Sequence, residues 1–428
     1  MKLSFLCLAS TAALVSAQGP LTPPGAPAPT QKSLQEIWDK LDAVAQTTDS
    51  LFFKADLLQQ QNALLNSKVQ ALQTQAAADN ERLQSLATLL SSTTAGLSWN
   101  IGTVDSGTTV GIYNSLAFGP DHQPAISYYD VGNKDLKFTR YNGTSWTSST
   151  VDSAHEVGLF NSLAFGPDGQ PAISYLDNTD FDLNFARFDG SSWSITHVDD
   201  EPGLETSIAF GVDGQPAIAY HQELAGLVKF ARFNGSTWTV STIFSFGHAS
   251  PWSAPSLVFS PSGQPTVSFY DDNDQCLRFA TLVGGAWTSV VVDPTGRNTT
   301  SLAYGPDGQP AIAYSAISPG SVLLLKIARY DGTAWSSVII DSNCDHCSLK
   351  FGPDGQPAIA YYNYLNKDLK FASFNGSTWS TSTIDAVGDV GFLASLAFGM
   401  DGLPAISYCD YSNSSLKFAR KGIFRPTP

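Results

Sequence analysis

The sequence contains little charge and few basic residues in particular. Only 14% of its 428 residues are charged, and 23 Lys and Arg stand against 38 Asp and Glu, which gives a formal net charge of −15. Because phosphate groups are bound by clustered Lys and Arg, this balance argues against a nucleic-acid partner. The sequence also lacks a Ser-His-Asp order, an HExxH motif and a phosphate-binding loop. No catalytic motif therefore identifies a reaction.

Long apolar runs are missing as well, apart from a short one at the N-terminus. Leu3–Val15 is mostly apolar, follows Lys2 and precedes the small residues Ser16 and Ala17. This order predicts a secretory signal peptide over residues 1–17, because the run is shorter than the ~20 apolar residues that cross a bilayer. We therefore expect an exported protein without a membrane span, extracellular or at the cell surface.

Cysteine is scarce. Of the five cysteines, Cys7 would leave with the leader, and Cys276, Cys344, Cys347 and Cys409 remain. Export permits disulfides, and four cysteines allow three pairings between which the sequence does not choose. The Cys344–Cys347 segment has no second CxxC and no HxxxH nearby, so a disulfide or inert thiols are favoured over a metal site.

Two segments precede the repetitive part of the chain. Residues 18–30 are rich in proline and predict an extended linker. Between Leu34 and Leu90, fourteen of the seventeen a and d heptad positions are apolar, which predicts an α-helical coiled-coil stalk over residues 31–92. Leucine at d and Asn62 at an a position favour a parallel homodimer, with a homotrimer as the next choice. The alternative is a helix that packs on its own globular domain.

The rest of the chain is an internal repeat. The unit SLAFGPDGQPAISY recurs, with small variations, at spacings of 47, 45, 49, 45, 47 and 47 residues. The units begin at Ser115, Ser162, Ser207, Ser256, Ser301, Ser348 and Ser395. In each unit an LKFARF-like segment follows, and most continue with an Asn-Gly or Asp-Gly hairpin turn. Four short strands (A to D) in about 45 residues are typical of a β-propeller blade.

The tryptophans indicate how the ring closes. The fourth strand of the repeat carries Trp99, Trp146, Trp193, Trp238, Trp287, Trp335 and Trp379. Trp99 precedes the first SLAF segment, so Leu97–Asp105 is a lone fourth strand and Ser395–Arg420 supplies only three strands. We therefore predict an all-β, seven-bladed β-propeller over residues 97–420 that is closed by its N-terminal strand, with residues 421–428 as a tail.

Over Leu97–Arg420 the repeats resemble the seven-bladed β-propeller proteins. The [ND]-G-[ST]-x-W hairpin is similar to a shortened Asp-box turn of sialidases, although the serine and aspartate spacing of that motif is not reproduced. The near-identical blades also resemble multivalent propeller lectins, which implies glycan binding. Sialidase-type catalysis would need three converging arginines, and the regularly repeated Arg140, Arg187 and Arg232 do not meet that need.

Residues that recur in every blade are expected to be scaffold. We expect the seven tryptophans to pack between blades, with sugar stacking as the alternative. The connections between strands B and C and between strands D and A share one face of the ring and vary between units, as binding faces do. His221, Glu223 and His346 are ionisable residues without a place in the repeat pattern.

Acidic and amide residues gather where strand B ends. The candidate ligand-binding residues are Asp130, Asn133, Asp135, Asp177, Asp180, Asp182, Asp271, Asp272, Asp274, Asn363, Asn366, Asp368 and Asp410. Such side chains accept hydrogen bonds from sugar hydroxyls or bind Ca²⁺, the one cofactor we consider. The alternative is that each bonds the backbone of its own turn.

These patterns predict a secreted, non-enzymatic binding or adhesion protein. The stalk would gather two or three propellers, and these would bind an extracellular glycan or a surface protein with avidity. One alternative is a polysaccharide hydrolase or lyase with an acidic cleft on the variable face. The other is a protein-binding scaffold without a small ligand.

Overall fold

The computed structural model describes residues 30–94, 97–107, 109–249 and 253–422. The predicted signal peptide, the linker up to residue 29 and the tail from residue 423 lie outside these ranges. The chain divides into two compact units at Arg82 and Leu83. The first contains most of one long helix, and the second contains the repeats.

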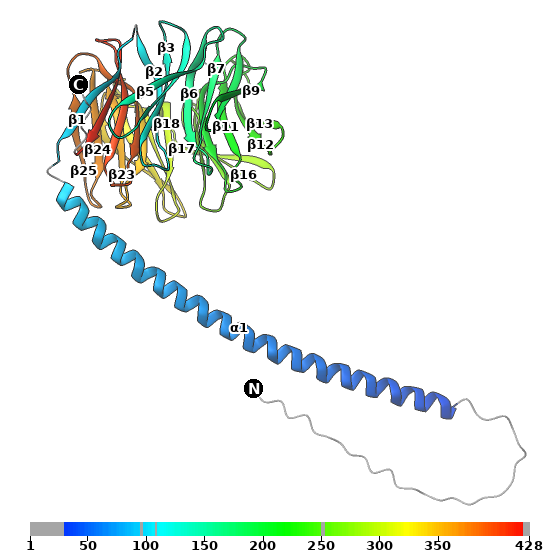
Figure 1. The fold of residues 1–428 in the computed structure, drawn as a ribbon. Helices are drawn as coiled ribbons and strands as arrows, with labels where there is room; N and C mark the ends of the chain where they lie inside the picture. The colour runs from blue at the N-terminus through cyan, green and yellow to red at the C-terminus, as the bar shows by residue number, and fades with distance from the viewer. Residues whose placement is uncertain (1–29, 95–96, 108, 250–252, 423–428) are drawn as a thin grey trace, which may run out of the picture. The chain divides into compact units, whose positions relative to one another are not determined.

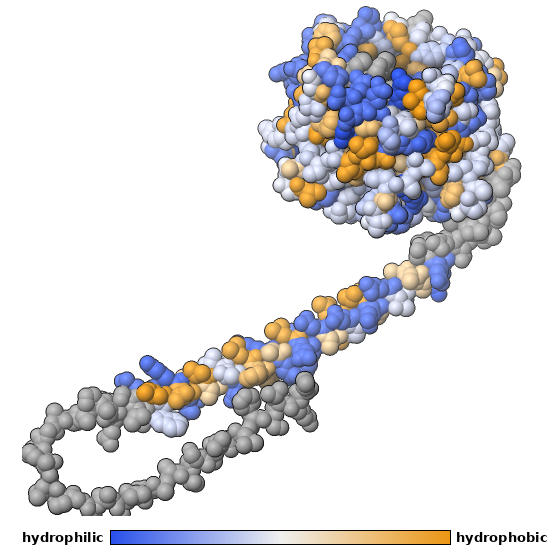
Figure 2. All heavy atoms as spheres, turned by 180° about the vertical axis from the view of Figure 1, so that it is seen from behind, coloured by the Kyte–Doolittle hydropathy of each residue, from blue (hydrophilic) through white to orange (hydrophobic). Residues whose placement is uncertain are grey.

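The helix α1 spans Thr30–Thr94 and includes the whole of the predicted stalk. The run contains no proline or glycine, so no residue interrupts the helical hydrogen bonds. Its apolar side chains are exposed: Leu51 is 60%, Leu58 58% and Leu72 69% accessible. Figure 2 shows apolar groups along the coloured part of the helix. Within the described ranges, no helix has an apolar stretch long enough to cross a membrane.

The second unit is a seven-bladed β-propeller, as predicted. It contains seven four-stranded sheets (Figure 1). Blade 1 is β2 (Val110–Phe118), β3 (Pro124–Asp130), β4 (Asp135–Tyr141) and β5 (Trp146–Asp152); blade 2 is β6 (Val157–Phe165), β7 (Pro171–Asp177), β8 (Asp182–Phe188) and β9 (Trp193–Asp199); blade 3 is β10 (Leu204–Phe210), β11 (Pro216–Gln222), β12 (Leu227–Phe233) and β13 (Trp238–Ser245). Blade 4 is β14 (Ser256–Phe259), β15 (Pro265–Asp271), β16 (Cys276–Val283) and β17 (Ala286–Asp293); blade 5 is β18 (Gly296–Tyr304), β19 (Pro310–Ile317), β20 (Leu323–Tyr330) and β21 (Trp335–Ser342); blade 6 is β22 (Cys344–Phe351), β23 (Pro357–Asn363), β24 (Asp368–Phe374) and β25 (Trp379–Asp385).

Blade 7 combines the two ends of the propeller. It contains β26 (Val390–Phe398), β27 (Pro404–Asp410), β28 (Ser415–Lys421) and, from the start of the propeller, β1 (Trp99–Asp105). The strand order is β1-β28-β27-β26, with Trp99 opposite Lys421. The cyan β1 accordingly lies beside the red C-terminal strands in Figure 1. This is the pairing that the position of Trp99 ahead of the first SLAF segment predicts.

The first serine of each SLAF unit links neighbouring blades. Its hydroxyl oxygen accepts a hydrogen bond from the backbone N–H that follows the equivalent serine in the next blade, as between Ser115 and Leu163 at 3.0 Å. The same bond recurs at all seven seams, with N···O distances of 2.9 to 3.2 Å. The last of these runs from Leu116 of blade 1 to Ser395 of blade 7. The recurrence of this serine is therefore explained by the scaffold.

The repeated tryptophans and arginines also pack between blades. Trp146 lies edge-on to Phe418 of the neighbouring blade, with ring centroids 5.2 Å apart. Arg140 forms an ion pair with Asp121 at 2.8 Å and lies over the Phe165 ring of the next blade, 5.1 Å from its centroid. The other arginines with this arrangement are Arg187, Arg232, Arg329 and Arg420. The expectation that the tryptophans pack between blades is confirmed. The arginines were expected on solvated strand faces and instead contact the next blade.

A buried tyrosine on strand B completes most seams. Its hydroxyl donates to an aspartate at the end of strand D of the preceding sheet, as from Tyr408 to Asp385 at 2.8 Å. The other pairs are Tyr128–Asp105, Tyr175–Asp152, Tyr220–Asp199, Tyr314–Asp293 and Tyr361–Asp341. At the seam between blades 3 and 4, Phe269 instead packs on Phe244, with ring centroids 5.3 Å apart. Donor and acceptor are replaced together there, so no buried polar group loses its partner.

Candidate functional site

A backbone irregularity marks the start of strand A in most blades. The pairing of strands A and B shifts register there in six blades, and in five of them the residue at the shift has a positive φ of 49° to 53°. These residues are Tyr113, Phe160, Glu205, His346 and Leu393. None is glycine, and such a conformation costs a bulky residue about 1–3 kcal/mol, a strain that often occurs at functional sites.

The strained residues line one cavity of about 840 Å³. The first strands of neighbouring blades contact one another around the ring, so their starting ends surround a common space. One residue from the equivalent position of each blade lines it: Tyr113, Phe160, Glu205, Ala254, Thr299, His346 and Leu393. The cavity lies on the face that carries the D–A and B–C connections, where the sequence analysis placed the ligand. Its walls are formed by different side chains, however.

Two aromatic pairs form part of the cavity wall. The rings of Tyr113 and Phe160 lie 4.3 Å apart between centroids, inclined by 46°. His346 and Phe392 lie 4.5 Å apart, edge to face at 62°. All four residues line the cavity, which therefore offers flat apolar surfaces to a bound ring.

The cavity is acidic. Glu205, Glu223 and Asp345 line it, and its described lining contains no Lys or Arg. Burial raises the pKa of Glu205, against the charge of His346 and a hydrogen bond from the Ala254 N–H. Burial would also raise the pKa of Asp345, but the hydrogen bond and charge of His346, 3.2 Å away, lower it. The site thus combines one carboxyl that is biased towards the protonated form with one that is held ionised.

The residue after the strained position supports the cavity wall at four seams. Asn161 accepts a hydrogen bond from Ser127 of the preceding blade at 2.5 Å. Thr206 pairs with Ser174 at 2.7 Å and donates to the carbonyl of Phe160 at 2.9 Å. The other two pairs are Thr300–Ser268 and Asn114–Ser407. Thr206 and Asn114 also donate to the carbonyls of the strained residues Phe160 and Leu393, and these bonds help to hold the wall in its irregular conformation.

The thirteen residues predicted from sequence lie elsewhere. None of them lines the central cavity. The residues that end strand B are buried and bond their own turn: Asp130 accepts from the Asn133 N–H at 3.2 Å, and Asp177 from the Thr179 N–H at 2.9 Å. Asp271, Asn363 and Asp410 do the same. These bonds match the alternative interpretation as turn residues, and ligand binding by the more exposed members stays a prediction.

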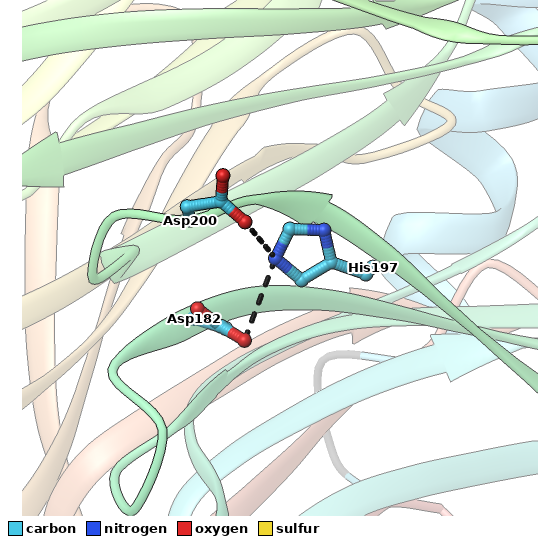
Figure 3. Close-up of side chains that lie close together, drawn as sticks. All are labelled: Asp182, His197 and Asp200. Atoms are coloured by element: carbon cyan, nitrogen blue, oxygen red, sulfur yellow. Dashed lines mark ion pairs between the residues drawn. The ribbon is translucent and has the colours of Figure 1, made fainter.

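Three of the predicted residues belong to two possible metal-binding groups, and Asp182 is part of the first. Asp182, His197 and Asp200 offer ligand atoms close together at the edge of blade 2 (Figure 3). His197 Nε2 lies 3.4 Å from Asp182 and 3.2 Å from Asp200. Ca²⁺ takes six to eight oxygen ligands, so an imidazole placed between two carboxylates does not suit it. The contacts of the His197 ring with the two carboxylates account for this arrangement without a metal ion.

A second such group lies in blade 4. It contains Asp271, Asp274 and Cys276. The Arg278 guanidinium already pairs with both carboxylates, and burial raises the pKa of the Cys276 thiol to about 11. This group therefore does not suit Ca²⁺ either.

The four cysteines of the described chain are free thiols. Burial raises the pKa of Cys347 and of Cys409 to about 12, which leaves very little thiolate at neutral pH. Of the two possibilities that the sequence left open, the structure shows inert thiols and not a disulfide.

No protein family profile and no curated protein matches the sequence. Among solved structures, a protein of unknown function from Dyadobacter fermentans is 12% identical, covers 76% of this chain and 98% of its own, and superposes with a TM-score of 0.50. AofleA from Arthrobotrys oligospora is 14% identical, with coverages of 68% and 91% and a TM-score of 0.45. The SapL1 lectin, solved with alpha methyl fucoside, is 12% identical, with coverages of 66% and 99% and a TM-score of 0.46. At these identities the similarity concerns the fold alone.

Proposed function

We propose that this is an exported, non-enzymatic binding protein whose propellers, gathered by a coiled-coil stalk, bind extracellular glycan in the central cavity. One observation carries the proposal. The blades repeat the same seam contacts, yet the equivalent cavity positions carry seven different residue types, among them Glu205, Ala254 and Phe160. A wall that is built from unlike residues on a uniform scaffold is suited to one asymmetric ligand.

The chemistry of the wall favours a sugar. The CH face of a sugar ring stacks on aromatic side chains such as Tyr113 and Phe160, and its hydroxyls donate to carboxylates such as Glu223. A cavity of about 840 Å³ has room for more than one ring.

The stalk would add avidity. The exposed heptad leucines of α1 would become buried against a second or third copy of the helix. Linked sites gain about 10²–10⁴ in apparent affinity without a new contact. Export follows from the predicted signal peptide over residues 1–17.

Binding of the mature full-length chain to a glycan array, followed by calorimetry on the hits, tests the proposal. We expect Phe160→Ala and Glu205→Gln to weaken binding at least tenfold without lowering the melting temperature. Phe181→Ala is the matched control, because Phe181 is an exposed aromatic residue of a B–C turn outside the cavity. A loss confined to Phe181→Ala would move the site to the B–C turns, and an array without any hit would refute glycan binding.

A second candidate function is favoured by the acids of the cavity. Glu205, with its raised pKa, is suited to act as a general acid, and Asp345 is ionised beside His346. A pair of this kind is the requirement for glycoside hydrolysis. Turnover of a polysaccharide panel that Glu205→Gln abolishes, while binding persists, would establish a hydrolase in place of a lectin.

A further inference from the structure

The seam between blades 4 and 5 lacks the arginine–aspartate pair of five other blades. Where those blades have arginine on strand C and aspartate in the A–B turn, blade 4 has Thr281 and Ser262. The aromatic residue on which the arginine would lie is retained in blade 5, as Tyr304. Both charged partners have therefore been replaced by small neutral residues, while the aromatic residue remains.

A second cavity, of about 700 Å³, occupies this seam. Ser262, Thr281 and Tyr304 all line it, so it includes the place that the arginine fills elsewhere. Its lining contains Trp335, whose ring centroid lies 5.3 Å from that of Phe279 and 5.5 Å from that of Tyr330. The cavity thus has an aromatic wall that the missing guanidinium leaves open.

The polar groups of this cavity are neutral. Gln264 and Gln309 from the two A–B turns line it. Besides Ser262, Thr281 and Tyr304, further hydroxyl residues of the lining are Ser260, Thr266, Thr288, Tyr330 and Thr333. Its described lining has no Asp, Glu, His, Lys or Arg. A charged ligand would leave water without a compensating charge, which is unfavourable. A ligand with an apolar ring face and several hydroxyls meets both the aromatic wall and the amides.

We propose that this second cavity binds one neutral saccharide ring. Its lining includes the A–B turns of blades 4 and 5 and the C–D turn of blade 5, which belong to the face of the ring opposite to the central cavity. The two sites share no lining residue. The proposal therefore does not rest on the function of the central cavity.

The repeat supplies the test variants. Thr281→Arg with Ser262→Asp rebuilds the pair that Arg140 and Asp121 form at 2.8 Å in blade 1, and fills the cavity with a contact that the scaffold already uses. The matched control is Ser373→Arg in blade 6, which adds an arginine at the equivalent position beside Asp354 and Phe398. Thr281→Gln fills part of the cavity without a charge, in case the double variant does not fold.

The measurement is saturation-transfer NMR and calorimetry of the full-length protein with methyl glycosides of neutral hexoses, pentoses and 6-deoxyhexoses. We expect at least one to bind the parent protein and Ser373→Arg equally, and to bind the double variant and Thr281→Gln at least tenfold more weakly. Phe181→Ala, an exposed position outside both cavities, should leave this binding unchanged. The proposal is overturned if no methyl glycoside binds, if the cavity-filling variants bind as tightly as the parent, or if indole binds and the glycosides do not.

Discussion

The seam between blades 6 and 7 offers a direct test of how the ring is stabilised. Asp385, 6% accessible, accepts hydrogen bonds from Tyr408 at 2.8 Å, from Lys417 at 2.9 Å and from the Val387 N–H at 3.1 Å. Replacing Asp385 by Ala would remove the only acceptor that the structure shows for the buried Tyr408 hydroxyl. Lys417 would keep a second partner, because Asp410 lies 3.1 Å away.

The magnitude follows from these contacts. Breaking a buried ion pair on one side costs about 3–5 kcal/mol, and an unsatisfied buried hydroxyl about 1–3 kcal/mol. Because Lys417 retains Asp410, we expect Asp385→Ala to lower the free energy of unfolding by about 3 kcal/mol, at the lower end for a broken buried pair. The double variant Asp385→Phe with Tyr408→Phe copies the Phe244–Phe269 seam. It removes donor and acceptor together, so we expect a loss of only about 1 kcal/mol.

Urea unfolding of the full-length protein, followed by tryptophan fluorescence, measures both values. The seam tryptophans lie between blades, so their emission reports separation of the sheets. The reasoning is refuted if Asp385→Ala unfolds at the parent's urea midpoint. It is equally refuted if the double phenylalanine variant is less stable than the single alanine variant.

Two further predictions concern acid stability and assembly. Burial would raise the pKa of Asp341 and of Asp385, but hydrogen bonds from lysine and tyrosine lower both pKa values below those of the unfolded chain. The stability that the two carboxylates give to the fold is therefore complete at neutral pH, and it is lost as the pH falls from about 4 through the folded pKa. An unchanged urea midpoint between pH 7 and pH 3 would contradict this. In the stalk, Leu58→Asp with Leu65→Asp should convert a dimer or trimer to a monomer in sedimentation equilibrium, whereas Gln70→Asp, at a b position, should not. A monomeric parent would exclude the coiled coil.

The propeller could be predicted from sequence because its information is repeated. The SLAF serine, the strand-D tryptophan and the Asn-Gly or Asp-Gly turns each recur at a fixed offset, and each performs one local task in every blade. The unpaired Trp99 strand even indicated which sheet takes strands from both ends of the propeller. Because each pattern occurs several times, an irregular blade can be recognised by comparison with the others.

The central cavity was not predicted, because the residues that line it differ from blade to blade. The predicted ligand-binding residues were acids at the ends of strand B, where Asp130 and Asp177 bond their own turns. The residues that meet in the cavity are about 45 positions apart in the chain, and they project from a register shift that no composition signal predicts. His346 and Glu223 stand out in the sequence as ionisable residues without a place in the repeat, but nothing in the sequence brings them together.

A comparison of each blade with the next would have identified the cavity wall. Where strand B carries a buried serine, as at Ser127, the next blade carries asparagine or threonine before its SLAF unit. Where strand B carries alanine, as at Ala313, the next blade carries a residue such as Cys347 that needs no such partner. A buried hydroxyl and its acceptor must change together, so this covariation identifies seam positions. The preceding residue, which is Tyr113, Phe160 or Glu205 in three of the blades, differs in all seven blades and does not follow this serine pairing. Within a repeat protein, variation that the scaffold does not compensate is the property expected of residues that face a ligand.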